Sequence, residues 1–177
     1  MNRSAMEYYE QVLHSPKGEH ARAYLESRGL SDETIRRFHI GYAPDSWDML
    51  SRTFTKKGMS LEGACTYGLL IKRPSGGYYD RFRDRVMFPI LDLSSEVIGF
   101  GGRAIGKADA KYINTPESPV FKKRRVLYNL RGAKETIRDS GVAVVEGYMD
   151  VVSLSNSGYP SAVATLGTAM SEDHVHL

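Results

Sequence analysis

Two carboxylates stand four residues apart, directly after a run of small apolar residues. Glu146 follows Val142-Ala143-Val144-Val145, a run that predicts a short, fully buried strand, and Asp150 lies in the first turn of a helix predicted over 148–157. Open α/β sheets bind their ligands at the carboxyl ends of parallel strands, and a spacing of four residues places both side chains on one side. The pair therefore predicts a cation-binding or catalytic site. The alternative is a solvated strand end with an acidic residue that favours the helix dipole.

Arginine residues that could bind an anion recur through the middle of the chain. Arg81, Arg83 and Arg85 alternate with other residues, which predicts three guanidinium groups on one face of a strand. Arg103 ends a glycine-rich strand predicted over 96–103. Because no helix pattern follows and Ala104 replaces the last required glycine, a dinucleotide-binding loop is excluded. Because glycine has no side chain, this strand predicts one of two structures. Either a nucleic-acid or nucleotide backbone approaches it closely beside a phosphate-binding Arg103, or it belongs to a tightly packed hairpin.

A cation, an aromatic ring and an amide follow within four residues. Lys111, Tyr112 and Asn114 lie in a segment with the composition of an ordered loop, and their side chains suit contacts with phosphate, base or ribose. Lys123 belongs to the basic run Lys122-Lys123-Arg124-Arg125. By itself, that run indicates a solvated surface or a generic polyanion patch.

Charge is divided unevenly along the 177 residues, although the net charge is only +3. Residues 1–69 carry no net charge, residues 70–138 carry +8, and residues 139–177 carry −5 with no Lys or Arg. This division predicts a polyanion-binding surface next to a carboxylate site. The single cysteine, Cys65, excludes an intrachain disulfide and a cysteine-based zinc site. The sequence has no run long and apolar enough for a membrane span and no secretory h-region, so the expected location is cytoplasmic.

The elements that position these residues change character twice. Residues 1–68 are predicted to be mainly helical, with Trp47 and the tyrosines at core spacing, and residues 69–138 form a basic region of strands and loops. Residues 139–177 begin with a strand, a helix and a second strand over 162–166. We expect the two strands to form a parallel pair. The predicted boundary lies near 138–141.

Two groups of segments carry a resemblance to known families. Glu146-Gly147-Tyr148-Met149-Asp150-Val151-Val152, followed by Ala164-Thr165-Leu166-Gly167-Thr168, resembles the opening of a Toprim domain, the metal-binding α/β fold shared by bacterial primases and topoisomerases. Upstream, segments 21–30, 38–44, 79–90, 97–103 and 111–117 resemble, in order, the RNA-polymerase core of the bacterial replicative DNA primase family. The resemblance implies an α/β chain, with a mixed α+β N-terminal subdomain over 1–138 and an incomplete Toprim-type, Rossmann-like βαβ unit over 139–177.

The resemblance also implies a function: synthesis of short RNA primers on a single-stranded DNA template from ribonucleoside triphosphates, with Mg²⁺ or Mn²⁺. Glu146 matches the family's catalytic and metal-binding Toprim carboxylate, and Asp150 matches a nearby acidic position with a supporting role. The positions associated with template or nucleotide binding match Arg81, Arg83, Arg103, Lys111, Tyr112, Asn114 and Lys123. The replicative helicase is an implied partner, through a region outside this sequence.

The chain also departs from the family pattern. The later Asp-x-Asp pair of the Toprim site and the N-terminal zinc ribbon do not occur in it, so we expect a partial core that is inactive alone. An incomplete Toprim sheet is expected to leave an unpaired edge and exposed apolar surface. The alternatives are a non-catalytic module that binds single-stranded DNA, or another Toprim enzyme: a phage primase-helicase, a topoisomerase or a nuclease.

Overall fold

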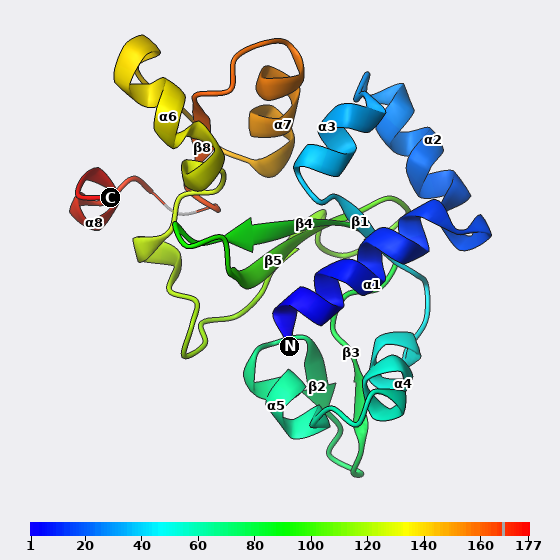
Figure 1. Cartoon of the computed structure of the whole chain (residues 1–177). Coiled ribbons are helices and arrows are strands. Elements are labelled where there is room, and N and C mark those ends of the chain that lie inside the picture. The colour runs from blue at the N-terminus through cyan, green and yellow to red at the C-terminus, as the bar shows by residue number, and fades with distance from the viewer. Residues whose placement is uncertain (168) are drawn as a thin grey trace.

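A computed structural model describes residues 1–167 and 169–177 (Figure 1). Its α-helices are α1 (Asn2–His14), α2 (Glu19–Ser27), α3 (Asp32–Arg37), α4 (Met49–Lys56), α5 (Leu61–Thr66), α6 (Leu130–Ser140), α7 (Tyr148–Asn156) and α8 (Glu172–Val175), with 3-10 turns η1 (Pro16–Gly18) and η2 (Lys123–Arg125). Its strands are β1 (Gly41–Ala43), β2 (Leu70–Lys72), β3 (Tyr78–Asp80), β4 (Arg85–Leu91), β5 (Val97–Ala104), β6 (Tyr112–Asn114), β7 (Ala143–Val145) and β8 (Ala162–Ala164). This mixture of helices and strands confirms the expected fold class.

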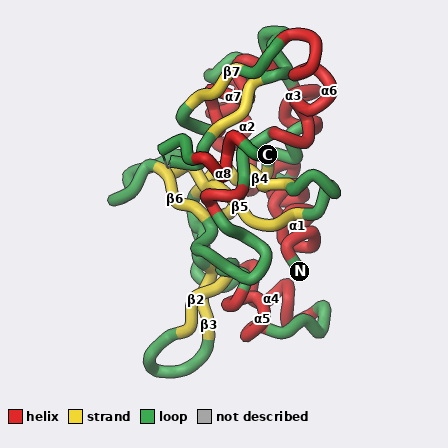
Figure 2. The backbone as a smooth tube through the Cα atoms, turned by 90° about the vertical axis from the view of Figure 1, so that its left-hand side faces the viewer, coloured by secondary structure: helices red, strands yellow, loops and turns green. Residues whose placement is uncertain are grey.

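An antiparallel sheet with the strand order β1-β4-β5-β6 lies at the centre of the molecule. Helix α1 crosses this sheet (Figure 1), because its apolar residues recur at helical spacing and form one buried face. The Tyr9 ring of that face meets the Phe100 ring of β5 edge-on, with 5.6 Å between centroids. A Cβ at Gly41 would lie 2.5 Å from the Tyr9 Cβ, so glycine is needed where β1 passes α1. Two short strands were not predicted: β1 lies at a break between predicted helices, and β6 lies in the segment predicted to be an ordered loop (Figure 2).

Two helices begin at serines that precede helical patterns in the sequence, whereas α4 begins later than its sequence signal indicates. The Ser31 and Ser60 hydroxyls accept hydrogen bonds from Thr34 and Gly63 N–H, as expected for N-caps. A cap at Asp45 or Ser46 was expected for α4, but the helix starts at Met49. The buried Asp80 carboxylate of β3 accepts from Leu50 and Ser51 N–H at 2.7 and 3.0 Å. A side chain distant in sequence therefore caps this helix.

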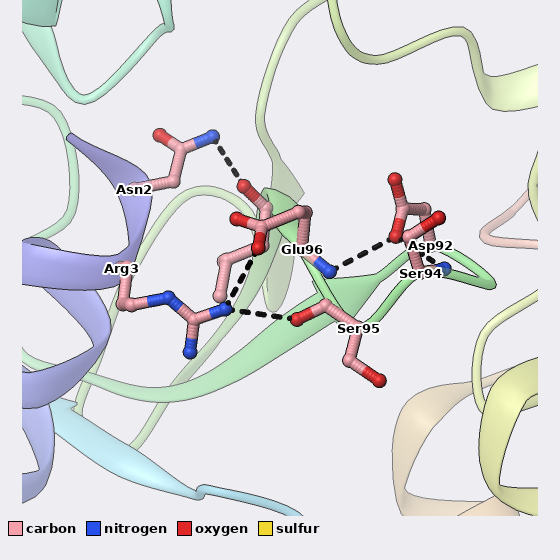
Figure 3. A network of polar contacts seen from close by, with 7 residues as sticks. Asn2, Arg3, Asp92, Ser94, Ser95 and Glu96 are labelled. Carbon is pink, nitrogen blue, oxygen red and sulfur yellow. Dashed lines mark hydrogen bonds and ion pairs between the residues drawn. The ribbon is translucent and has the colours of Figure 1, made fainter.

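The start of α1 is tied to the turn between β4 and β5 (Figure 3). Asn2 donates to the Val97 carbonyl at 3.0 Å, and Arg3 donates to the Ser95 carbonyl and the Glu96 carboxylate. Within the turn, Asp92 accepts from Ser94 and Glu96 N–H, which fixes the turn's shape. These contacts set the position of α1 along the sheet.

The prediction that Arg81, Arg83 and Arg85 share one face of a single strand is wrong. Strand β3 ends at Asp80, residues 81–84 form an irregular connection, and β4 begins at Arg85. Asp84 has a left-handed φ of 48°, which extended backbone does not allow. The three arginines therefore point into separate surroundings instead of sharing a strand face.

The β7–β8 pair is parallel, as predicted, and α7 connects its strands. The prediction of a fully buried first strand is wrong, because Val142 and Val144 remain 48% and 45% exposed. Within the described residues, β7 pairs only with β8, so one edge and one face of β7 are uncovered. Thr168, the last residue of the Toprim-like segments, lies outside the described residues. None of the described helices has the length and apolar character needed to cross a membrane.

Gly101 of β5 provides the first test of this packing. Replacing it with Ala places a methyl group inside the Tyr148 ring, so Gly101→Ala should lower the free energy of unfolding by about 1–3 kcal/mol. Urea denaturation measures the change. Gly63→Ala, inside α5, is the matched control, because the nearest atom to the added methyl is the flexible end of Met1. Equal stability of the two variants would contradict the proposed fit.

Candidate functional site

A cleft of about 380 Å³ brings together residues from both halves of the chain. It is lined by Lys111, Tyr112, Asn114, Glu146, Gly147, Tyr148, Asp150, Leu166 and Gly167. Lys111 and the two carboxylates lie in different regions of the sequence, and the fold brings them into the lining of one cleft. We call these two parts of the lining the cationic wall and the acidic wall. The cleft therefore combines groups that bind anions with groups that bind cations.

The acidic wall is the connection between β7 and α7. Glu146 and Asp150 are both exposed, and the Asp150 carboxylate lies beside Gly147, close enough that a Cβ there would be 3.3 Å from Oδ2. The described residues contain no cluster of three or more His, Cys, Asp or Glu able to hold a metal ion. Two carboxylates that line one cleft nevertheless suit a cation such as Mg²⁺, which takes one or two carboxylates and completes its shell with water and phosphate oxygens.

The cationic wall is formed by Lys111 and by Tyr112 and Asn114 of β6. Arg103 of the paired strand β5 lies next to this wall but does not line the cleft. Arg103 and Tyr112 are direct partners in the antiparallel pair, and the Arg103 guanidinium lies between the Tyr112 ring, at 5.7 Å, and the Tyr24 ring of α2, at 4.9 Å. Burial raises the pKa of the Tyr112 phenol; the charge of Arg103 opposes that rise and the charge of Asp150 adds to it. The phenol is therefore neutral near pH 7 and can donate a hydrogen bond.

Asn114 lies in this cleft but is bonded within the protein at both ends of its amide. It accepts from the Tyr148 hydroxyl at 2.7 Å and donates to the Leu166 carbonyl at 3.0 Å. Its expected contact with a nucleotide would compete with these bonds. The space beside two glycines of β5 is likewise occupied by side chains of the protein itself, because Tyr148 covers Gly101 and Phe82 lies against Gly102. Of the two accounts of the glycine-rich strand, the geometry favours the tightly packed hairpin.

A second cluster of rings and guanidinium groups surrounds the β2–β3 hairpin. The Trp47 ring is 55% exposed, and the Arg83 guanidinium lies over it at 4.0 Å from its centroid. Tyr79 lies 5.4 Å from Trp47, and the Arg73 guanidinium lies over Tyr79 at 4.9 Å. The prediction that Trp47 packs in the core is wrong, because α4 begins two residues after it and leaves the ring on the preceding loop. We call Trp47, Arg73, Tyr79 and Arg83 the hairpin cluster.

The remaining predicted cations lie outside the lining of the cleft. Arg81 is partly buried, its Nε has no hydrogen-bond partner among the described residues, and burial lowers the pKa of its guanidinium. Lys123 lies in η2, where its carbonyl accepts from His174 of α8. Four residues of these two sites were not predicted from the sequence: Tyr24, Arg73, Tyr79 and Tyr148. Only Tyr148 had a local signal, its place between Glu146 and Asp150.

Two families match successive parts of the chain. Residues 8–134 match the DNA primase catalytic core, N-terminal domain, and residues 140–177 match the Toprim domain. The first match disfavours a topoisomerase, which the sequence alone left as an alternative.

Curated proteins and solved structures that are similar to this chain are also DNA primases. The DNA primase of Deinococcus radiodurans is 46% identical over 179 residues, a match that covers 100% of this chain and 31% of the relative. The Escherichia coli K12 DNA primase is 46% identical over 171 residues, covering 96% and 29%. A solved DnaG catalytic core matches with a TM-score of 0.90 and 43% identity over 99% of this chain and 56% of its own. A DnaG primase catalytic domain bound to single-stranded DNA has a TM-score of 0.90 and 44% identity, over 99% and 57%.

The chain thus spans about a third of the curated relatives and somewhat more than half of the solved chains. The carboxylates and cations of the cleft lie in two segments that match consecutive parts of one enzyme core. The chain belongs to the DNA primase family, of which it contains the N-terminal domain of the catalytic core and the start of the Toprim domain.

Proposed function

We propose that this chain supplies the template-binding and nucleotide-binding part of a primase core that makes RNA primers on single-stranded DNA. The observation that carries the proposal is the cleft, which Glu146 and Asp150 line together with Lys111 and Tyr112. Phosphoryl transfer needs such a combination, because a divalent cation and protein cations share the charge of the triphosphate.

In this proposal, ribonucleoside triphosphates bind in the cleft. Lys111 contacts phosphate, and the neutral Tyr112 phenol donates a hydrogen bond to a phosphate or ribose oxygen. Glu146, supported by Asp150, would hold Mg²⁺ or Mn²⁺. When bound, the cation polarises the reacting phosphate and activates the attacking hydroxyl. Arg103, held between two rings, provides a fixed positive charge behind this wall.

The template would bind at the hairpin cluster. An exposed indole ring beside two guanidinium groups combines base stacking with phosphate contacts, which is how proteins bind single strands without reading sequence. The similar catalytic domain bound to single-stranded DNA supports this choice of ligand. A replicative helicase partner and a cytoplasmic location remain proposals that follow from the family.

The hairpin cluster should dominate DNA affinity. Replacing Trp47 with Ala removes one stacking platform and should weaken oligonucleotide binding by about 1–3 kcal/mol. Arg83→Ala should also weaken binding and reduce its salt dependence. Fluorescence anisotropy of a labelled oligo(dT), at low and moderate salt, measures both effects.

Trp47 is the only tryptophan, so quenching of its fluorescence in the wild type reports contact with the oligonucleotide directly. Arg52→Ala is the matched control, because Arg52 is exposed on α4 and pairs with Asp48. Equal losses in all three variants would contradict a localised site.

Lys111 should matter for nucleotide and not for template. Lys111→Ala removes a cation from the cleft wall and should weaken binding of a fluorescent ATP analogue in the presence of Mg²⁺ by about 1–3 kcal/mol. Lys107→Ala removes an equally exposed charge from the same connection and serves as the control. An unchanged affinity in Lys111→Ala would exclude the proposed phosphate contact.

The 177-residue chain alone should make no primers. Among the described residues, Glu146 and Asp150 are the only carboxylates that line the cleft, and two-metal phosphoryl transfer needs more carboxylate ligands than these. Incorporation of labelled ribonucleotides on a single-stranded template, with Escherichia coli primase as positive control, tests this expectation. Labelled RNA from the pure chain would show that these two carboxylates suffice.

A further inference from the structure

Tyr148 lies between the two carboxylates in sequence and has no place in the chemistry described above. It is the first residue of α7 and only 3% exposed. Its ring stacks on Phe88 of β4 with 5.3 Å between centroids and an interplanar angle of 16°, and it meets Tyr128 edge-on at 4.8 Å. Burial raises the pKa of its phenol well above the ordinary value, so the hydroxyl stays protonated and donates. A ring this enclosed cannot contact a ligand with its face.

The ring rests on a socket formed by one pair of residues in the central sheet. Gly101 of β5 and Asn114 of β6 are direct partners in the antiparallel register. Gly101 offers no side chain, and a Cβ there would collide with the far end of the Tyr148 ring. The hydroxyl at that end donates to Asn114 Oδ1 at 2.7 Å. The socket therefore specifies both the depth and the direction of the Tyr148 side chain.

Asn114 extends this contact to the second strand of the βαβ unit. Its Nδ2 donates to the carbonyl of Leu166 at 3.0 Å. Leu166 follows β8, has a left-handed φ of 61° and lines the cleft. One amide thus ties the segments after both β7 and β8 to the same point of the central sheet.

The opposite end of α7 is anchored separately. Asn156 accepts from Ser31 N–H and from the hydroxyls of Ser31 and Thr34, and it donates to the Gly29 carbonyl at 3.0 Å. Helix α7 is therefore attached at its last residue to α3 and at its first residue to the sheet. Because Glu146 precedes the first residue by only two positions, the Tyr148 attachment is the one that governs it.

We propose that Tyr148 and Asn114 are positioning residues: through the Gly101 socket they hold the Glu146 carboxylate and the Leu166 turn at a fixed place across the cleft from Lys111. The cation-binding role of Glu146 in this inference rests on the proposed function, whereas the socket itself does not. Asn114 acts within the protein, and the nucleotide contact expected for it from the family resemblance is replaced by this structural link.

Three variants isolate the link. Tyr148→Phe deletes one hydroxyl and keeps the ring, and Asn114→Ala removes both hydrogen bonds. Tyr159→Phe deletes the same atom from a tyrosine that is 65% exposed, after the end of α7, and is the matched control. Amide hydrogen exchange, resolved by residue, compares Val151 in the first turn of α7 with Ser157, the C-cap whose N–H bonds to the last turn.

If the link positions Glu146, exchange accelerates at Val151 and around Leu166 in Tyr148→Phe and Asn114→Ala, while Ser157 keeps the wild-type rate. A hydroxyl that only adds general stability would accelerate both ends of α7 together. Uniform acceleration, or none, overturns the proposal. Tyr159→Phe should match the wild type throughout.

A binding measurement then connects the link to the carboxylate. Mn²⁺ titrations followed by electron paramagnetic resonance compare the wild type with Glu146→Gln, which defines the binding due to that carboxylate. Tyr148→Phe and Asn114→Ala should each weaken this component roughly tenfold, the loss typical when a residue that orients a metal ligand is removed. Selective loosening of the first turn with unchanged Mn²⁺ affinity overturns the proposal.

The two proposals fail in different ways. If Glu146→Gln binds Mn²⁺ as the wild type does, the proposed metal role of Glu146 fails, and the exchange pattern alone decides whether the socket holds the first turn. Oligo(dT) binding at the hairpin cluster should be unchanged in Tyr148→Phe, because the ring and guanidinium contacts of that cluster are made among its own residues on and beside the β2–β3 hairpin. A parallel loss of DNA binding and first-turn protection would indicate general unfolding and overturn the positioning role.

Discussion

The contact between the Tyr148 ring and the bare backbone of Gly101 is the constraint on which the functional arrangement depends. Cores are packed closely enough that a single added methyl group must displace something. Here the displaced group would be the residue that follows Glu146-Gly147. The central sheet belongs to the segment that matches the primase catalytic core, and α7 belongs to the segment that matches Toprim. The geometry of the cleft is therefore decided where these two segments pack together, beneath the side chains that we propose bind ligands.

The same packing logic explains why the cations are held by rings. A guanidinium group that is taken from water loses hydration and needs compensation, and aromatic faces supply part of it without neutralising the charge. Arg103 between Tyr24 and Tyr112, and Arg83 over Trp47, are two cases. An acidic partner would stabilise each arginine as well, but it would cancel the field that an anionic ligand needs. The rings keep the arginines ordered and leave their charge available.

The sequence predicted local structure and chemical character well and long-range packing poorly. The N-caps at Ser31 and Ser60, and the parallel β7–β8 pair, follow from short-range patterns that the fold preserves. The errors concern residues whose surroundings are set by distant segments. Asp80, the last residue of β3, caps the distant helix α4. Because β3 ends at Asp80, Arg81 and Arg83 lie outside any strand and Arg85 begins the next one. The exposure of Trp47 and Val144 depends on where neighbouring elements stop, and alternation or apolar content contains no such information.

The cleft that combines the cationic and acidic walls could be predicted only in part. The charge division along the chain predicted that both kinds of surface exist, but their contact follows from the Tyr148 socket. The absence of Lys and Arg after residue 138 then acquires a physical meaning. Within the described part of the chain, neither Glu146 nor Asp150 takes part in any of the ion pairs. A nearby lysine on the βαβ unit could pair with either carboxylate and compete with a divalent cation. Lys111 lines the cleft from the segment before β6 instead, and Arg103 of β5 lies beside that segment. In the proposed function, a ligand that carries phosphate lies between these cations and the two carboxylates.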